Sequence, residues 1–210
     1  MGTIKQGILG GFRGSVANIV GSSWKGIAVI KSKPLSVANP QTAAQTSNRN
    51  QFSQVVAFAV AILTATIKPL LDRIAVQMSG YNYFVSANKS LFDADGLATP
   101  ANLVISTGTV TPMADLAGVT SAGNDRVDLT WTDNSGVGDA LATDVCYGCI
   151  YNETKNEAIS IPSTATRADE ALQCPTPEDW DDGDTKHVWT AFRKASGTAS
   201  STTAYDAIDV

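Results

Sequence analysis

The chain has 210 residues, of which 43% are hydrophobic, and a formal net charge of −5. This size allows one or two domains with cores of their own. Its basic residues are too interleaved with apolar ones for a disordered nucleic-acid-binding tail, which would be mostly Lys and Arg.

The charge is divided unevenly along the chain. Residues 1–71 carry seven basic side chains and no acidic one, and the first acidic residue is Asp72; the remainder carries eight basic and 20 acidic side chains. We favour a basic segment that packs on an acidic surface of the same chain or of a neighbouring copy. The alternatives are contact with nucleic acid and an ordinary solvated face.

Residues 1–38 contain short β-rich runs interrupted by glycine. In "WKGIAVIKSKP", Ile27, Val29 and Lys31 alternate with Ala28 and Ile30 before a proline ends the run. Glycine at this density permits tight turns and close backbone approach, but it raises the entropic cost of ordering. We therefore expect a glycine-rich basic β arm or hairpin that gains stability by lying on another surface.

Residues 39–96 are predicted to be helical. Pro40 places Asn39 outside helical space, and Asn39 or Thr42 can cap the helix that follows. Pro69 predicts a kink or break near 65–68, and Gly80 is expected to close this long helix. "YNYFVSANKSLF" predicts a second, short helix. The apolar positions that recur at steps of three or four in the long helix are Phe52, Val55, Val56, Ala59, Leu63, Ile67, Leu70, Ile74 and Met78.

Residues 103–210 are expected to form a β-sandwich similar to immunoglobulin or fibronectin type III domains. In "RVDLTWTDN", Val127, Leu129 and Trp131 alternate with polar residues, which predicts a half-buried strand. Four further runs predict strands: "TDVCYGCIYN", "EAISIP", "KHVWTAFRKA" and "TAYDAIDV". The fold class expected for the chain is therefore α+β.

Residues suited to catalysis or to metal binding are few. Cys146 and Cys149 form a C-x-x-C, but strand alternation puts them on opposite faces, so we expect ordinary reduced thiols, with contact between either one and Cys174 possible. The single histidine, His187, has no Ser or Cys nucleophile in a recognisable motif, and we interpret it as a strand histidine at the sheet surface.

The acidic cluster at 178–184 is the best metal candidate. Its "DWDDGDTKHVWT" has Gly183 one place early for an EF-hand, and Thr190 stands where the loop needs glutamate. We interpret the cluster as a solvated turn between strands, with Trp180 packed back onto the sheets. "GILGGFRG" fits neither dinucleotide-binding nor phosphate-loop spacing, so no catalytic residue, cofactor or metal is expected.

No targeting segment is expected, because glycines and Arg13 interrupt the N-terminal apolar residues. The most apolar run, Val55 to Ile67, has 13 residues, which is short for a membrane span. We interpret it as a buried helix of a soluble protein.

Two segments, "IKQGILGGFRGSVANIVGSSWKG" and "SKPLSVANPQTAAQTSNRNQF", carry a resemblance to a known family. They resemble a family of small proteins of Bacteroidota and their tailed phages, which share a glycine-rich start, a G-S-S-W-K-G turn and a K-P…N-P-x-T…Q…R..F segment leading into a helix. The matching residues are Gly7, Gly10, Gly11, Phe12, Gly14, Val20, Gly21, Trp24, Lys25, Gly26, Lys33, Pro34, Asn39, Pro40, Thr42, Gln45, Arg49 and Phe52.

The resemblance implies a non-enzymatic structural protein of the virion, assembled in the host cytoplasm. Capsid decoration or a head fibre, the neck, and the tail all stay open, as does a secreted or surface adhesion module. The expected partners are other copies of the chain, other virion proteins and a host-surface glycan, with neither nucleic acid nor membrane. The expected assembly interface comprises Phe12, Arg13, Trp24, Lys25, Lys31, Lys33, Arg49 and Phe52.

Overall fold

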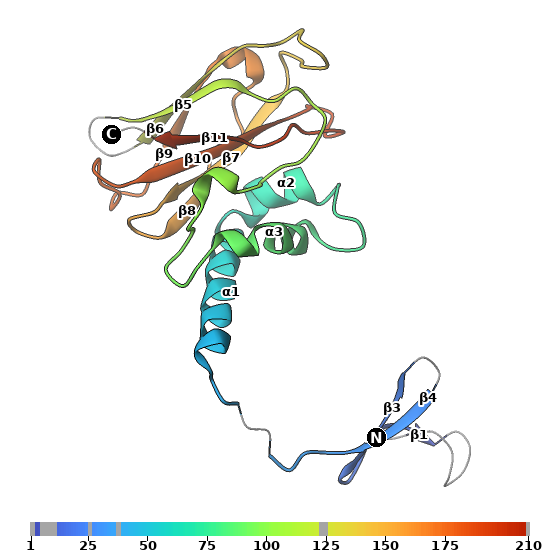
Figure 1. Cartoon of the computed structure of the whole chain (residues 1–210). Coiled ribbons are helices and arrows are strands. Elements are labelled where there is room, and N and C mark those ends of the chain that lie inside the picture. The colour runs from blue at the N-terminus through green and yellow to red at the C-terminus, as the bar shows by residue number, and fades with distance from the viewer. Residues whose placement is uncertain (1–2, 5–11, 25–26, 37–38, 122–125, 209–210) are drawn as a thin grey trace. The chain divides into compact units, whose positions relative to one another are not determined.

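The computed structural model describes residues 3–4, 12–24, 27–36, 39–121 and 126–208. The chain divides into two compact units, Met1–Thr42 and Ala43–Val210, which are described separately below. The division at 42 lies close to the end of the expected arm. The helical region and the following strands, by contrast, belong to a single unit (Figure 1).

The first unit is an antiparallel sheet in the order β1-β2-β3-β4. Its strands are Thr3–Ile4, Phe12–Val16, Ile19–Trp24 and Ile27–Ser32. Val16 pairs with Ile19, so Ala17 and Asn18 form the turn between β2 and β3. Ala17 adopts a left-handed φ of 48°, which costs a non-glycine residue about 1–2 kcal/mol. The β character expected of the arm is therefore present in its described residues.

The second unit begins with a bent helical segment. Helix α1 (Ala43–Ala61) is followed by a π-helical turn at Leu63–Ile67 and by α2 (Lys68–Leu71), and the axis turns by 69° across the break. Pro69 lies in the first turn of α2, where its missing N–H leaves a carbonyl of the preceding turn without the usual α-helical donor. A bend is present, but it lies at Ile62, before the stretch 65–68 where the sequence predicts it.

The predicted length of this helix was wrong. The helix ends at Leu71, and Met78 at the end of the expected stripe is 47% exposed. Gly80 begins α3 (Gly80–Asn88) instead of closing the preceding run, because the Ser79 hydroxyl accepts a hydrogen bond from the Asn82 amide, 3.3 Å away, and caps the new helix. Short 3₁₀ turns follow at Lys89–Leu91, Pro100–Asn102 and Arg167–Asp169.

Seven strands form two sheets, in the orders β11-β10-β7-β8 and β5-β6-β9. The strands are β5 (Ala114–Thr120), β6 (Arg126–Thr132), β7 (Val145–Asn152), β8 (Glu157–Ser160), β9 (Ala171–Pro175), β10 (Lys186–Arg193) and β11 (Ala204–Ile208). All five strands expected from alternation are confirmed. Strands β5 and β9 were missed, since a bulge between Ala114 and Ala117 breaks the period of the first and proline ends the second.

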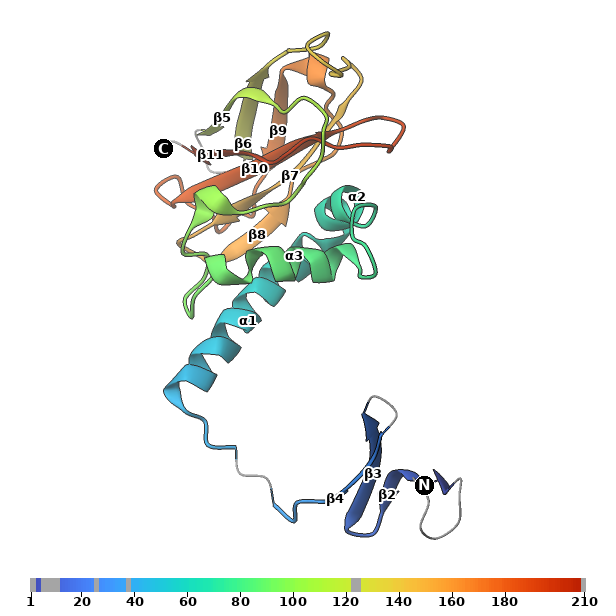
Figure 2. The ribbon, with the colours of Figure 1, turned by 45° about the vertical axis from the view of Figure 1, so that its right-hand side comes forward.

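The sheet that contains β7 and β10 is covered on both faces. Cys149 and Tyr151 of β7 pack with the helices, whereas Cys146 and Ile150 pack with residues of β6 and β9. Figure 2 shows α2 and α3 beside this sheet on one side, and β5, β6 and β9 on the other. The second unit is thus a mixed structure with a helical layer and two sheets, in which two buried clusters share the β7–β10 pair.

Phe58 is the aromatic centre of the cluster between α1 and the sheet. Its ring centroid lies 5.9 Å from that of Phe84, 5.4 Å from that of Tyr151 and 6.1 Å from that of Trp189. Phe58 is absent from the apolar stripe predicted for this helix. The predicted stripe included Phe52 on the buried side of the helix, whereas Phe52 is 50% exposed.

Replacing Phe58 by alanine should lower the free energy of unfolding by about 3–5 kcal/mol, because it removes the ring on which four other aromatic rings pack. Val60→Ala is the control on the same helix, since Val60 is 59% exposed and its loss should cost less than about 0.5 kcal/mol. Denaturant unfolding followed by circular dichroism measures both. A loss below 1 kcal/mol for Phe58→Ala would contradict this packing.

Candidate assembly surface

The register of the N-terminal sheet separates its two faces. Residues directly opposite in an antiparallel ladder point to the same side, and neighbours along a strand point to opposite sides. Val29 pairs with Ser22, and Ile30 pairs with Gly21. Val29 and Ile30 therefore lie on different faces of the sheet.

One face is basic and is called the basic face below. Lys31 and Lys33 follow Ile27 and Val29 at steps of two, and all four side chains are exposed. The Lys33 amide donates to the Asn18 carbonyl at 2.7 Å, so the ladder continues past the end of β4. This face offers ammonium groups on an aliphatic background. The described residues assigned to it are Arg13, Ser15, Val20, Ser22, Ile27, Val29, Lys31 and Lys33.

The opposite face has no charged residue among those described, and it is called the uncharged face. Val16, Ile19 and Ile30 leave 49%, 46% and 60% of their surface exposed. Its described residues are Gly14, Val16, Ile19, Gly21, Ser23, Ala28, Ile30 and Ser32. Because a sheet with both faces open buries too little apolar surface to be stable alone, this unit needs a covering surface.

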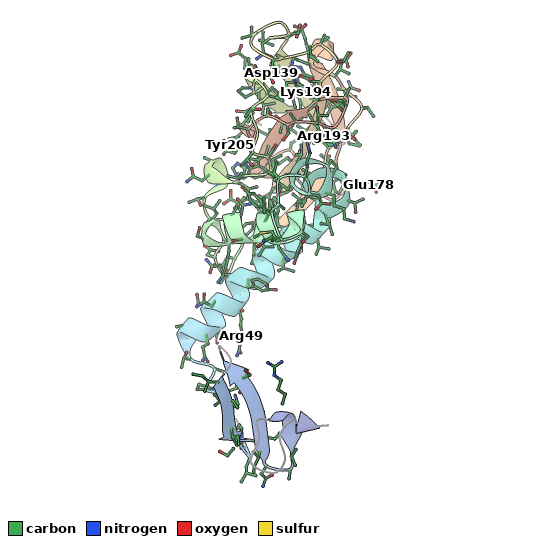
Figure 3. All side chains as sticks on the ribbon, turned by 90° about the vertical axis from the view of Figure 1, so that its right-hand side faces the viewer. Arg49, Asp139, Glu178, Arg193, Lys194 and Tyr205 are labelled. Atoms are coloured by element: carbon green, nitrogen blue, oxygen red, sulfur yellow. The ribbon has the colours of Figure 1, made fainter. Side chains whose placement is uncertain are left out.

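Helix α1 presents a second exposed apolar face. Gln45, Arg49, Phe52, Val56 and Val60 follow one another at steps of three or four and so share one side of the helix. Phe52 is 50% exposed, in contrast to the buried Val55, Phe58, Ala59 and Ile62 on the core side. Arg49 lies in the N-terminal half of α1, away from the sheets of the second unit (Figure 3).

The expected interface residues are divided between the two units. Arg13, Lys31 and Lys33 are exposed in the first unit, and Arg49 and Phe52 are exposed on α1. Lys25 and the side chains of Phe12 and Trp24 lie outside the described residues. Sequence reasoning missed Val16, Ile19, Ile30 and Val60. Alternation along β3 and β4, and the step of four from Phe52 to Val56 and Val60, would have found them.

Residues 11–206 match the family of unknown function DUF6266, and the chain belongs to this family. No curated protein and no solved structure matches the chain.

No single helix in the described part of the chain is long and apolar enough to cross a membrane. The bent pair Ala43–Ala61 and Leu63–Leu71 meets the criterion by length and composition only.

The three cysteines lie in the interior of the second unit and are not joined in disulfides. Cys149 faces the cluster under the helices, while Cys146 and Cys174 share the cluster between the sheets, so the expected contact to Cys174 involves Cys146. Burial raises the pKa of Cys146 and Cys149 well above the ordinary range, and burial with the nearby Asp128 carboxylate raises that of Cys174 to about 12.

These thiols should not react with an aromatic disulfide reagent at pH 8 while the protein is folded. Burial excludes the reagent and keeps each sulfur protonated, and the thiolate is the reactive form. All three should react once guanidinium chloride unfolds the chain. Rapid reaction of any thiol in the native protein would contradict their placement.

His187 was expected at the surface of the sheet, and this prediction was wrong: its side chain is buried, with 7% of the residue exposed. Its Nδ1 is 3.1 Å from the Tyr205 hydroxyl, and its Nε2 is 3.0 Å from a carboxylate oxygen of Glu153. Burial raises the pKa of Tyr205, with smaller contributions from nearby carboxylates, so its hydroxyl stays protonated. These contacts fix the orientation of the imidazole between β10 and β11.

The acidic turn after β9 is organised by internal hydrogen bonds. One carboxylate oxygen of Asp184 accepts from the Asn152 side chain at 2.7 Å and from the Asp181 amide at 2.9 Å. The buried ammonium of Lys186 donates to the carbonyls of Asp181 and Asp184, and Trp180 is fully buried as expected. The described residues contain no group of three His, Cys, Asp or Glu side chains placed to hold a metal ion.

Asp184 should contribute stability that depends on pH. Burial alone would raise its pKa, but the bonds from Asn152 and the Asp181 amide, with the nearby ammonium groups, lower it overall. The stabilisation is therefore complete above the unfolded pKa of about 3.9 and is lost as pH falls through the lower folded pKa.

Asp184→Asn should lower the free energy of unfolding by about 1–3 kcal/mol at pH 6, and the difference from wild type should shrink at pH 3. Denaturant unfolding at the two pH values measures it. Asp179→Asn, at an exposed position of the same turn, is the control and should have little effect. A difference in the free energy of unfolding between wild type and Asp184→Asn that grows at pH 3 would contradict a lowered pKa for Asp184.

A cleft of about 320 Å³ lies beside α2 in the second unit. Arg73 and Arg193 line it together with the hydroxyl-bearing Thr109 and Thr198, and Leu70 and Ile74 supply apolar walls. Lys194, which directly follows Arg193, forms an ion pair with Asp139, with 3.3 Å between its ammonium nitrogen and a carboxylate oxygen (Figure 3). The cleft offers two guanidinium groups and hydroxyls, a set suited to an anionic, hydroxyl-rich ligand.

Proposed function

We propose that this protein is a non-enzymatic structural component of a tailed-phage virion, which docks through its N-terminal sheet and displays the two sheets of its second unit. The observation that carries the proposal is the sheet of the first unit, whose aliphatic side chains are exposed on both faces. Such a surface is completed by assembly with other chains.

The basic face supplies the docking contacts in this proposal. Lys31 and Lys33 would select an acidic surface on a neighbouring subunit or on the shell protein. Strand β4 also forms one edge of its sheet, so an extended segment of the partner can add to it through main-chain hydrogen bonds. The charge of the lysines would then select the partner, and the main-chain hydrogen bonds would fix the register of the added strand against β4.

The displayed part is proposed to be a β-sandwich of the immunoglobulin or fibronectin type III kind. Its four and three strands match the seven of such domains, and side chains of both sheets share one buried cluster. By analogy with sandwiches displayed on particle surfaces, we place capsid decoration or a head fibre ahead of the neck and tail.

A secreted or surface adhesion module is the second candidate. The cleft beside α2 favours it, because Arg73 and Arg193 could bind the carboxylate of an acidic host-surface glycan while the hydroxyls bind its ring substituents. A virion protein that displays this cleft on the particle surface would also bind an acidic host-surface glycan there.

The test is mass spectrometry and cryo-electron microscopy of purified particles from the phage that encodes the chain. Particles should contain many ordered copies. Lys31→Glu with Lys33→Glu should reduce incorporation at least about tenfold, because like charge then faces the acidic partner. Lys68→Glu with Lys155→Glu makes the same change of net charge on exposed residues of the second unit and should leave incorporation unchanged.

The two parts of the proposal fail in different ways. If the wild-type chain is absent from the particles, the virion role is wrong and the adhesion role becomes the better explanation. If the chain is present and both double variants are incorporated equally, the virion role stands and docking through the basic face is wrong.

A further inference from the structure

We propose that the uncharged face of the N-terminal sheet binds the same face of a second copy of this chain, so that two sheets pack face to face. This pairing goes beyond the proposed virion role and does not depend on it. It assigns the two faces of the sheet to different partners: one to a second copy and one to an acidic surface.

The first argument is the separation of charge between the faces. Ile30 and Lys31 are neighbours in β4 and point to opposite sides, and the described residues of the face with Ile30 carry no charge. Three aliphatic side chains stand exposed there, those of Val16, Ile19 and Ile30. Removing this apolar surface from water is favourable only against an apolar partner surface.

The second argument concerns the occupant. An identical uncharged face buries no ion when it packs on this one, whereas the exposed face of α1 in another copy would bring Arg49 to the contact. The basic face is excluded in the same way, because Lys31 and Lys33 would be buried against aliphatic groups. A second uncharged face is therefore the complementary surface that this chain itself supplies.

The third argument is shape. Ile30 pairs with Gly21, and Ile19 pairs with Ser32, so large and small side chains alternate across the face. Gly21 itself is buried, so the side chains that project from the face around it are those of Ile19 and Ile30. Stacked sheets lie about 10 Å apart with interdigitated side chains, and a two-fold axis makes one such patch complementary to itself.

Pairing also has a consequence for the basic face. With the uncharged faces buried against one another, the basic faces of both copies point outward on opposite sides. Each pair then presents Lys31 and Lys33 on two opposite sides, so that one pair can bridge two acidic surfaces.

Analytical ultracentrifugation of the full chain over a range of concentrations tests the pairing. The wild-type chain should sediment as a dimer that dissociates on dilution. Ile30→Lys should weaken dimerisation at least about 100-fold, because each copy would bury a cation at the contact. Val29→Lys is the matched control: it adds the same charge one residue away on the basic face and should leave the dimer intact.

Cross-linking gives a second readout that does not rely on a destabilising change. Ser23 lies on the uncharged face and Ser22 on the basic face, while the three natural cysteines are buried. A bifunctional maleimide long enough to bridge sheets about 10 Å apart should link Ser23→Cys into a covalent dimer, and Ser22→Cys should stay monomeric under denaturing electrophoresis.

Three results would overturn the proposal. One is a wild-type chain that remains monomeric at all concentrations. Another is a dimer that withstands Ile30→Lys but dissociates with Val29→Lys or with Phe52→Lys, which would place the contact on the basic face or on α1. The last is equal cross-linking of the two cysteine variants. None of these bears on whether the chain occurs in particles.

Discussion

The pairing of β7 with β10 is the constraint on which the second unit depends. The two strands pair over eight residues, from Lys186 with Asn152 to Arg193 with Val145, and both of their faces are buried. Side chains that point one way meet the helices, and those that point the other way meet β6 and β9. Since either covering layer alone would leave one face of this pair in water, helices and sheets have to fold as one unit.

The same principle distinguishes the two units. In the second unit both faces of the β7–β10 pair have a covering layer, and the buried Arg167 guanidinium lies 3.1 Å from the Asp144 carboxylate and over the ring of Phe192. In the described part of the first unit the strands pair with one another, but aliphatic side chains stay exposed on both faces. This contrast between a covered central sheet and a sheet with exposed aliphatic side chains underlies both proposals made above.

Charge follows this division. The acid-free segment up to residue 71 includes the open sheet and most of the bent helical segment, and the acidic residues lie in the body that would be displayed. Within the sheet the sorting is finer, because alternation in β4 sends Lys31 to one side and Ile30 to the other. In the two proposals this single strand would supply a surface for electrostatic selection and a surface for apolar packing. Copies that pair through the second surface would display the first one twice.

The sequence by itself determined the local structure. Alternation located β6, β7 and β10, Pro69 indicated that the helix is interrupted although the bend lies earlier, at Ile62, and the absence of acids marked Lys31 and Lys33 as a docking candidate. Only the tertiary structure decided which apolar side of α1 is buried, where Phe58 and not Phe52 meets the sheet, and that His187 is enclosed. The tertiary structure also revealed β5 and β9, which alternation did not predict because β5 contains a bulge and β9 is short. The physical reason is that periodicity reports which residues share a face, a property of the local backbone, whereas burial depends on which distant element covers that face.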